Sequence, residues 1–97
     1  MALDRMKMPD SAWRLIPLAE RWGIDDDFER EAAVDSASYD QLRHLAASLD
    51  DVEDEFWDWL AGPESYSPSP STEYLAMTAL TMAVDSARVT LERRSEV

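Results

Sequence analysis

The chain has 97 residues and a mass of 11.0 kDa, enough for one small domain whose folding removes roughly 60 to 65% of its surface from water. Apolar residues make up 45% of the chain, as in globular proteins, although the formal net charge is −12. The absence of cysteine excludes disulfides, thiol nucleophiles and thiolate metal sites, and an isoelectric point near 4.2 opposes direct binding to nucleic acid or anionic lipid.

The first predicted helix covers about residues 14–22. Its apolar residues recur with the spacing i, i+3, i+4 and i+7, which places Leu15, Leu18, Ala19 and Trp22 on one helix face. Pro17 fits the first turn, where its missing N–H costs nothing. Gly23 follows at the position of a left-handed C-cap, and we expect Gly62 to play the same part later in the chain. Residues 1–10, before this helix, are expected to be flexible.

Two capping signals predict the next two helices. Asp26 and Glu29 form a D-x-x-E pattern, which predicts a helix over about residues 26–35 with Phe28 and Ala32 facing inward. Ser38 and Gln41 form a capping box. It begins a third helix whose inner face carries Leu42, Leu45, Ala46 and Leu49.

A fourth predicted helix is capped by Asp50 or Asp51 and ends at Ala61, Gly62 and Pro63. Its inner face carries Val52, Phe56, Trp59 and Leu60. Residues 63–70 alternate serine and proline, which predicts an extended loop, and Ser69 or Ser71 then caps the last helix.

The last helix carries the longest apolar stripe, formed by Met77, Leu80, Val84, Ala87 and Leu91 and widened by Leu75, Ala79, Met82 and Ala83. An arc this wide indicates contact with helices on two sides. No segment alternates with the period of a strand, so the sequence predicts an all-α fold: a small bundle of four to five helices in one domain over residues 1–97, with the C-terminal helix longest and central. Pairing of Arg88 with Asp85 or Glu92 is possible along its polar side.

No catalytic, cofactor-binding or metal-binding pattern is present, so we expect no enzyme activity and no cofactor. His44 is the only histidine, and its place off the inner face of the third helix predicts an exposed side chain. The chain lacks the paired Glu-x-x-His motifs of di-iron bundles, the spacing of an EF-hand loop and any glycine-rich phosphate loop. A hydrolase or metal-binding enzyme built on carboxylates is a distant third hypothesis, since no pair of acids is singled out.

The charge distribution is more informative than any motif. Between Arg43 and Arg88 the chain contains no lysine or arginine but nine acidic residues. On a helical wheel of the fourth helix, one arc holds a ridge of carboxylates formed by Asp51, Asp54, Glu55 and Asp58. Like charges at these spacings repel, so the ridge costs the helix a few tenths of a kcal/mol per pair, about 0.2 to 0.5.

Four tryptophans are many for so short a chain. Trp22 and Trp59 fall on inner faces, whereas Trp13 and Trp57 are predicted to be partly exposed. Trp57 lies beside the carboxylate ridge, and an aromatic anchor within a charged rim is typical of an interface hot spot. The alternative is that Trp57 packs beneath the prolines of residues 68–70.

These patterns favour a small acidic cytoplasmic protein-binding module, of the inhibitor, immunity or adaptor type. It would bind a basic protein partner through Asp51, Asp54, Glu55, Trp57 and Asp58. A sharper form of this hypothesis is that the carboxylate row mimics nucleic-acid phosphates. The alternative is a structural protein that forms homo-oligomers, in which a dimer buries Met77, Leu80, Met82 or Leu91 and the acidity serves solubility. We expect no membrane association, because the apolar runs are short and no signal peptide is present.

Overall fold

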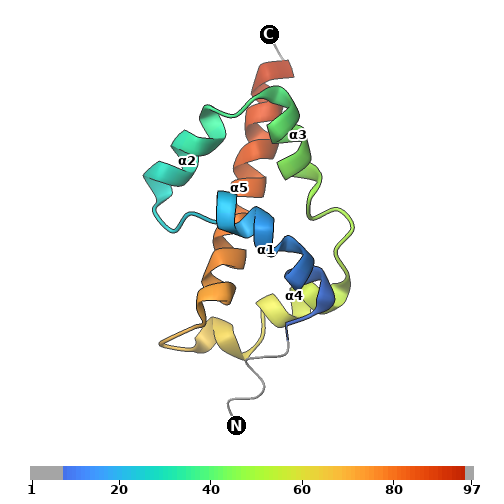
Figure 1. Ribbon diagram of the computed structural model, residues 1–97, viewed down its shortest axis with the longest axis vertical. Helices are drawn as coiled ribbons and strands as arrows, with labels where there is room; N and C mark the ends of the chain where they lie inside the picture. Colours follow the sequence, from blue (N-terminus) through green and yellow to red (C-terminus); the bar gives the residue numbers. More distant parts are fainter. Residues whose placement is uncertain (1–7, 96–97) are drawn as a thin grey trace.

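The computed structural model describes residues 8–95, which form five α-helices, one short 3₁₀ helix and no strand (Figure 1). In chain order these are α1 (Asp10–Trp22), α2 (Asp27–Asp35), α3 (Tyr39–Ala47), α4 (Asp54–Leu60), the 3₁₀ helix η2 (Pro63–Tyr66) and α5 (Thr72–Ser95). The predicted all-α bundle with the C-terminal helix longest is confirmed.

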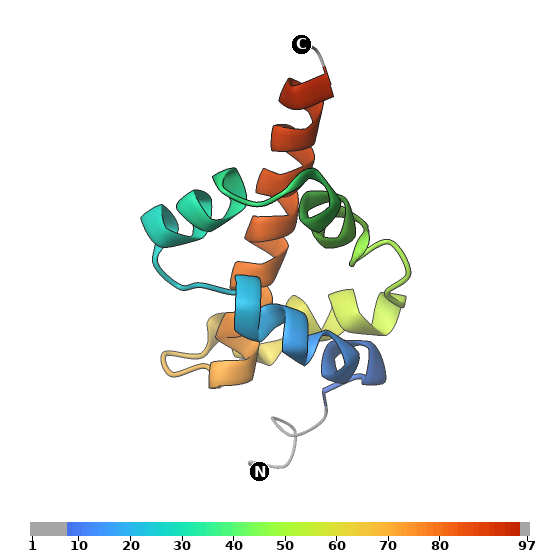
Figure 2. The ribbon, with the colours of Figure 1, turned by 45° about the horizontal axis from the view of Figure 1, so that its top comes forward.

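Helix α5 is the axis of the bundle, and the other α-helices pack around it (Figures 1 and 2). Helix α1 crosses in front of the middle of α5, α2 and α3 lie on either side of its C-terminal half, and α4 lies near its N-terminal half. Its inner residues are fully buried, and they include Met77, Leu80, Ala83, Val84 and Ala87. The prediction that Met77 and Leu80 could lie between two chains is therefore wrong, because both are fully buried within one chain.

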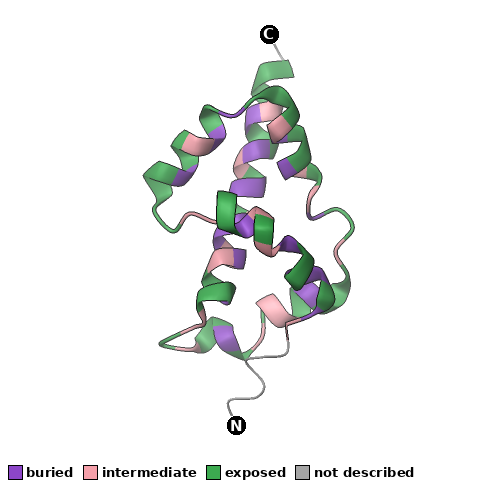
Figure 3. Ribbon diagram, viewed as in Figure 1, coloured by how far each residue is buried: buried purple, intermediate pink, exposed green. Residues whose placement is uncertain are grey.

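The buried apolar side chains form one cluster to which all five α-helices contribute. Figure 3 marks the buried positions along the ribbon. The inner faces predicted for α1 and α3 are confirmed at Leu15, Ala19, Leu42 and Leu45, all of which are buried. Burial of these side chains is the main favourable term in folding, at about 1.5 to 3 kcal/mol for each large side chain.

Helix α1 begins four residues earlier than predicted. Pro9 is its N-cap, and the carbonyl oxygen of Pro9 accepts hydrogen bonds from the N–H groups of Ala12 and Trp13 at 2.9 and 3.2 Å. Pro17 therefore lies inside the helix and not in its first turn. The segment predicted to be flexible, residues 1–10, falls mostly on residues 1–7, which lie outside the described residues. Of the rest, Met8 is partly buried, Pro9 is buried and Asp10 belongs to α1.

The glycines do not adopt the left-handed C-cap conformation that we predicted. Gly23 has φ −80° and Gly62 has φ −81°, and neither differs in this respect from an ordinary residue. Gly23 is needed for space: it lies where the end of α1 meets the backbone of α5.

Helices α2 and α3 begin as predicted. The N–H of Glu29 donates to Asp26 Oδ1 at 2.9 Å, and Ser38 and Gln41 form the complete capping box. The predicted inner residues of α2 are wrong, because Phe28 is 87% exposed and Ala32 is also exposed.

The face of α2 that packs on α5 carries Val34 and Arg30 instead. The buried Arg30 side chain donates to the carbonyl oxygen of Ile24 at 2.8 Å and pairs with Asp27. Because these bonds satisfy much of its guanidinium, an arginine can occupy a position where the sequence pattern predicts an apolar residue.

The predicted extended Ser/Pro loop of residues 63–70 begins with the 3₁₀ helix η2, and the remaining residues 67–70 bend at Pro68 and Ser69. The prediction of an extended path for the whole loop is therefore wrong. Of the two predicted caps of α5, Ser71 is the one used: its Oγ accepts from the N–H of Tyr74 at 3.2 Å. The buried Glu64 accepts from the N–H and the Oγ of Ser71, at 3.2 and 2.6 Å. A carboxylate in this place also interacts favourably with the N-terminal end of the α5 dipole.

Candidate protein-docking surface

Helix α4 is held against α5 by aromatic contacts. Phe56 is fully buried, and the ring of the partly buried Trp59 meets the ring of Tyr74 edge to face, with centroids 5.5 Å apart. The hydroxyl of Tyr74 donates to the carbonyl oxygen of Leu60 at 2.7 Å and thereby satisfies one acceptor at the end of α4. These contacts fix which side of α4 faces the core.

The opposite side of α4 is open to solvent and carries Asp54, Glu55, Trp57 and Asp58, which we call the α4 face. Trp57 is 43% exposed and makes an edge-to-face contact with Phe56, with ring centroids 5.1 Å apart. The partial exposure predicted for Trp57 is therefore confirmed. Seven residues form α4, so these four side chains lie within two helical turns.

Asp51 does not belong to the helical ridge that the sequence predicted, because α4 begins at Asp54. Neither Asp50 nor Asp51 caps the helix; the N-cap is Glu53, whose side chain makes no capping hydrogen bond. The turn that ends α3 continues through these residues: the N–H of Asp50 donates to the carbonyl oxygen of Ala47 at 3.1 Å. Asp51 is exposed in that turn, three residues before the α4 face.

The carboxylates of this region lack ion-pair partners within residues 8–95, with one exception. Asp50 pairs with Arg88 of α5 at 3.2 Å, which replaces the pairs of Arg88 with Asp85 or Glu92 that the sequence allowed. Asp51, Glu53, Asp54, Glu55 and Asp58 are all exposed. No carboxylate of the α4 face therefore forms an ion pair in the part of the chain that the structure describes.

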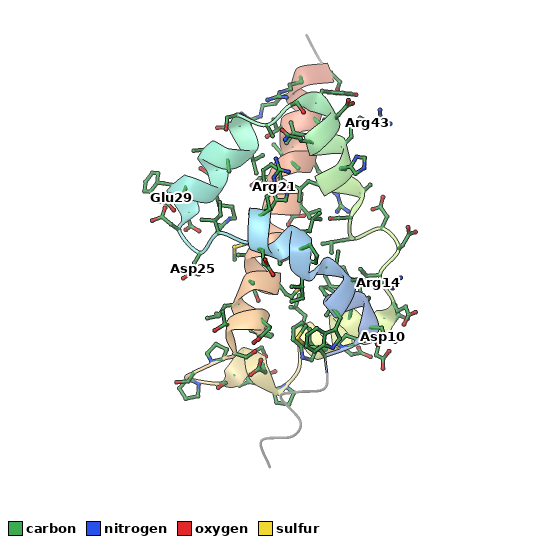
Figure 4. All side chains as sticks on the ribbon, in the orientation of Figure 1. Asp10, Arg14, Arg21, Asp25, Glu29 and Arg43 are labelled. Carbon is green, nitrogen blue, oxygen red and sulfur yellow. The ribbon has the colours of Figure 1, made fainter. Side chains whose placement is uncertain are left out.

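Arg14 is a neighbour of this region that the sequence did not suggest. It lines a small pocket between α1 and the turn before α4, together with Ser11, Leu15, Ser48, Asp51 and Val52. Figure 4 shows Asp10 and Arg14 on the part of α1 that lies beside α4. Only the packing of α1 beside this turn places Arg14 near Asp51, and no sequence spacing could have indicated it.

The remaining tryptophans and the histidine lie as predicted. Trp22 is buried, Trp59 is partly buried, and Trp13 is exposed on α1. His44 is exposed on α3, in a shallow groove that Arg88 and Asp50 also line.

Among the described residues, no group of three or more histidine, aspartate or glutamate side chains is arranged to hold a metal ion. The helices within residues 8–95 also include none with the length and apolar character of a membrane span. Around α4 the described surface carries exposed carboxylates and a partly exposed tryptophan.

No protein-family model matches the chain, and comparisons with curated proteins and with solved structures find no match either.

Proposed function

We propose that this protein is a small binding module that docks a basic surface of a partner protein through the α4 face and the adjacent Asp51. The proposal is supported by one observation above all: an exposed tryptophan lies among exposed carboxylates that have no ion-pair partner within residues 8–95.

Helix stability explains some of these acids but not Asp58. Asp54 and Glu55 occupy the first turn of α4, where negative charge interacts favourably with the helix dipole. Asp58 lies in the last turn, where the dipole favours positive charge and where α4 has no basic residue. A carboxylate there disfavours the helix slightly, so a role in binding accounts for it better than a role in folding.

The two kinds of side chain would contribute differently to binding. Exposed carboxylates accelerate encounter with a basic partner and orient it, an effect that salt screens. Trp57 would supply the apolar anchor, because a partly exposed tryptophan gains a large buried area when a partner covers it.

The experiment is affinity capture from an extract of the source cells with three baits. The first is the wild type, and the second carries Asp51→Asn, Asp54→Asn, Glu55→Gln and Asp58→Asn. The third is a matched control with Glu20→Gln, Asp25→Asn, Glu29→Gln and Asp40→Asn, which loses the same charge from exposed positions on other helices and loops.

A basic protein retained by the wild type and the control, lost from the α4 variant and released by moderate salt is the expected result. Its binding should also weaken on Trp57→Ala, by about 2 kcal/mol or more if Trp57 is a hot spot. Equal recovery on all three baits would contradict the proposal, and equal loss from both variants would show that only the net charge matters.

A further inference from the structure

A second exposed surface lies on α5, on the side that α1 and α3 leave uncovered. Three large apolar side chains on this side are exposed to solvent: Leu75, Met82 and Val89, at 43%, 47% and 49%. They recur every seven residues, so they form one stripe along the helix, about 21 Å long at 1.5 Å per residue. Between Met82 and Val89 lies the small, partly buried Ser86, which leaves room for a second helix to approach. Ala79, between Leu75 and Met82, is already buried within the chain.

Along the C-terminal half of α5 this stripe borders a groove formed with α2. The groove is lined by Glu31, Val34 and Asp35 of α2 and by Asp85, Ser86, Val89, Thr90 and Arg93 of α5. In Figures 1 and 2 the first turn of α2 diverges from α5, and this turn carries the strongly exposed Phe28. The stripe and the groove together are called the α2–α5 face below.

The charge of the groove is predominantly negative. Glu31, Asp35 and Asp85 are exposed and form no ion pair within residues 8–95. The nearby arginines are used elsewhere: Arg30 binds the carbonyl oxygen of Ile24, and Arg94 donates to the carbonyl oxygens of Ala37 and Asp35 at 3.2 and 3.0 Å. Arg93 is thus the one cation among the residues that line the groove.

We propose that the α2–α5 face binds an amphipathic helix of a partner, with apolar side chains spaced by seven residues and lysines or arginines along one edge. An α-helix that packs along a second helix presents the same face to it every seven residues. A stripe with heptad spacing therefore suits a partner helix that lies along α5. The carboxylates of the groove then face the basic edge of that helix, whose apolar residues cover Met82 and Val89.

The charge argues against a second copy of this chain as the occupant. A symmetric dimer through α5 would place Glu31, Asp35 and Asp85 of both copies at one interface, in a chain whose formal net charge is already −12. Like charges brought together across an interface oppose association. A basic helix removes this repulsion and supplies the missing counter-charges.

The test uses two fluorescein-labelled synthetic 18-residue peptides that form amphipathic helices. Both have leucine at heptad positions, and they differ in carrying lysine or glutamate along one edge. Fluorescence anisotropy with the full chain should show binding of the lysine peptide, and the glutamate peptide should bind at least about tenfold more weakly. Failure of the lysine peptide to bind would overturn the proposal.

Matched charge-reversal variants separate a specific site from attraction to an acidic protein. Glu31→Lys with Asp85→Lys alters the groove, and Asp51→Lys with Asp58→Lys makes the same charge change around α4. We expect the groove variant to weaken lysine-peptide binding about tenfold or more and the α4 variant to weaken it less than about twofold. Equal weakening by the two variants would show attraction by net charge alone and overturn the proposal.

The apolar part of the face is tested by Met82→Ser with Val89→Ser, which should also weaken lysine-peptide binding about tenfold. Both residues are about half exposed, so the variant is expected to fold, and its circular dichroism should match the wild type. The matched control is Trp57→Ala, which should leave peptide binding unchanged while it weakens the partner of the α4 face. These variants therefore test the α2–α5 face and the α4 face separately, and either proposal can be contradicted without the other.

Sedimentation equilibrium of the wild type decides the remaining alternative. We expect a monomer of 11.0 kDa. A dimer that dissociates on Met82→Ser with Val89→Ser would show that a second copy occupies the face, and would overturn the assignment of a basic helix.

Discussion

Gly23, at the end of α1, lies directly against the backbone of Ala76 in α5. A Cβ atom on Gly23 would lie 2.5 Å from the carbonyl oxygen of Ala76 and 2.5 Å from that of Ala19. Both obstacles are backbone atoms of helices, which cannot move aside without displacing a helix. This contact sets how closely α1 approaches the central helix.

We therefore predict that Gly23→Ala destabilises the protein by about 1 to 3 kcal/mol, in the range of overpacking substitutions. Urea unfolding followed by circular dichroism measures the change. Gly62→Ala is the comparison, because its nearest backbone atoms lie 3.2 Å from the added Cβ, and it should cost less. An equal cost at the two positions would contradict this view of the α1 and α5 contact.

At the start of α5, Ser71 and Tyr74 each make a hydrogen bond that holds neighbouring segments together. Ser71→Ala removes both the cap on the N–H of Tyr74 and the donor to Glu64, so we expect a loss of about 1 to 2 kcal/mol. Tyr74→Phe removes only the bond to the carbonyl oxygen of Leu60 and should cost about 1 kcal/mol. Thermal unfolding of both variants measures the two losses of stability. A larger loss for Tyr74→Phe than for Ser71→Ala would contradict this prediction.

Trp22 and Trp57 should differ strongly in their contribution to stability. Trp22 is 7% exposed within the core, and Trp22→Ala is expected to cost about 3 to 5 kcal/mol. Trp57→Ala should cost less, about 1 to 2 kcal/mol, since the side chain is 43% exposed and its ring contact is with Phe56. If chemical denaturation shows a large loss for Trp57→Ala, this residue is structural and its assignment to the docking surface is wrong.

The ion pair between Asp50 and Arg88 is expected to matter little for stability. Both side chains are about half exposed or more, at 61% and 49%, so solvent screens their attraction. Asp50→Asn should change the free energy of unfolding by no more than about 0.5 kcal/mol at physiological salt. A larger loss would mean that this pair fixes the turn between α3 and α4, and with it the position of Asp51.

Local signals in the sequence were enough for the helices and several of their caps. Asp26, the Ser38 and Gln41 capping box, and Ser71 act within three residues of their own position, so their roles follow from short-range geometry. The central part of the α5 stripe is equally direct, because a helix that buries Met77, Leu80, Val84 and Ala87 must be surrounded. The prediction that Leu75 and Met82 widen this inner stripe is wrong, since both are exposed. The angle between Trp57 and Phe56 on the same helix left two interpretations open, partial exposure or packing beneath residues 68–70, and the structure shows a side chain that is 43% exposed.

Only the tertiary structure decided the features that depend on contacts with a segment elsewhere in the chain. Arg30 takes the inner place predicted for Phe28 because a carbonyl six residues earlier and Asp27 receive its guanidinium. Asp50 does not cap α4 because the turn that ends α3 continues through it, and its carboxylate pairs with Arg88, 38 residues away. The sequence by itself determined that these segments are helical and acidic, since propensity, capping and charge are local properties. Which faces remain open for a partner was decided by packing, because exposure is a property of the assembled helices.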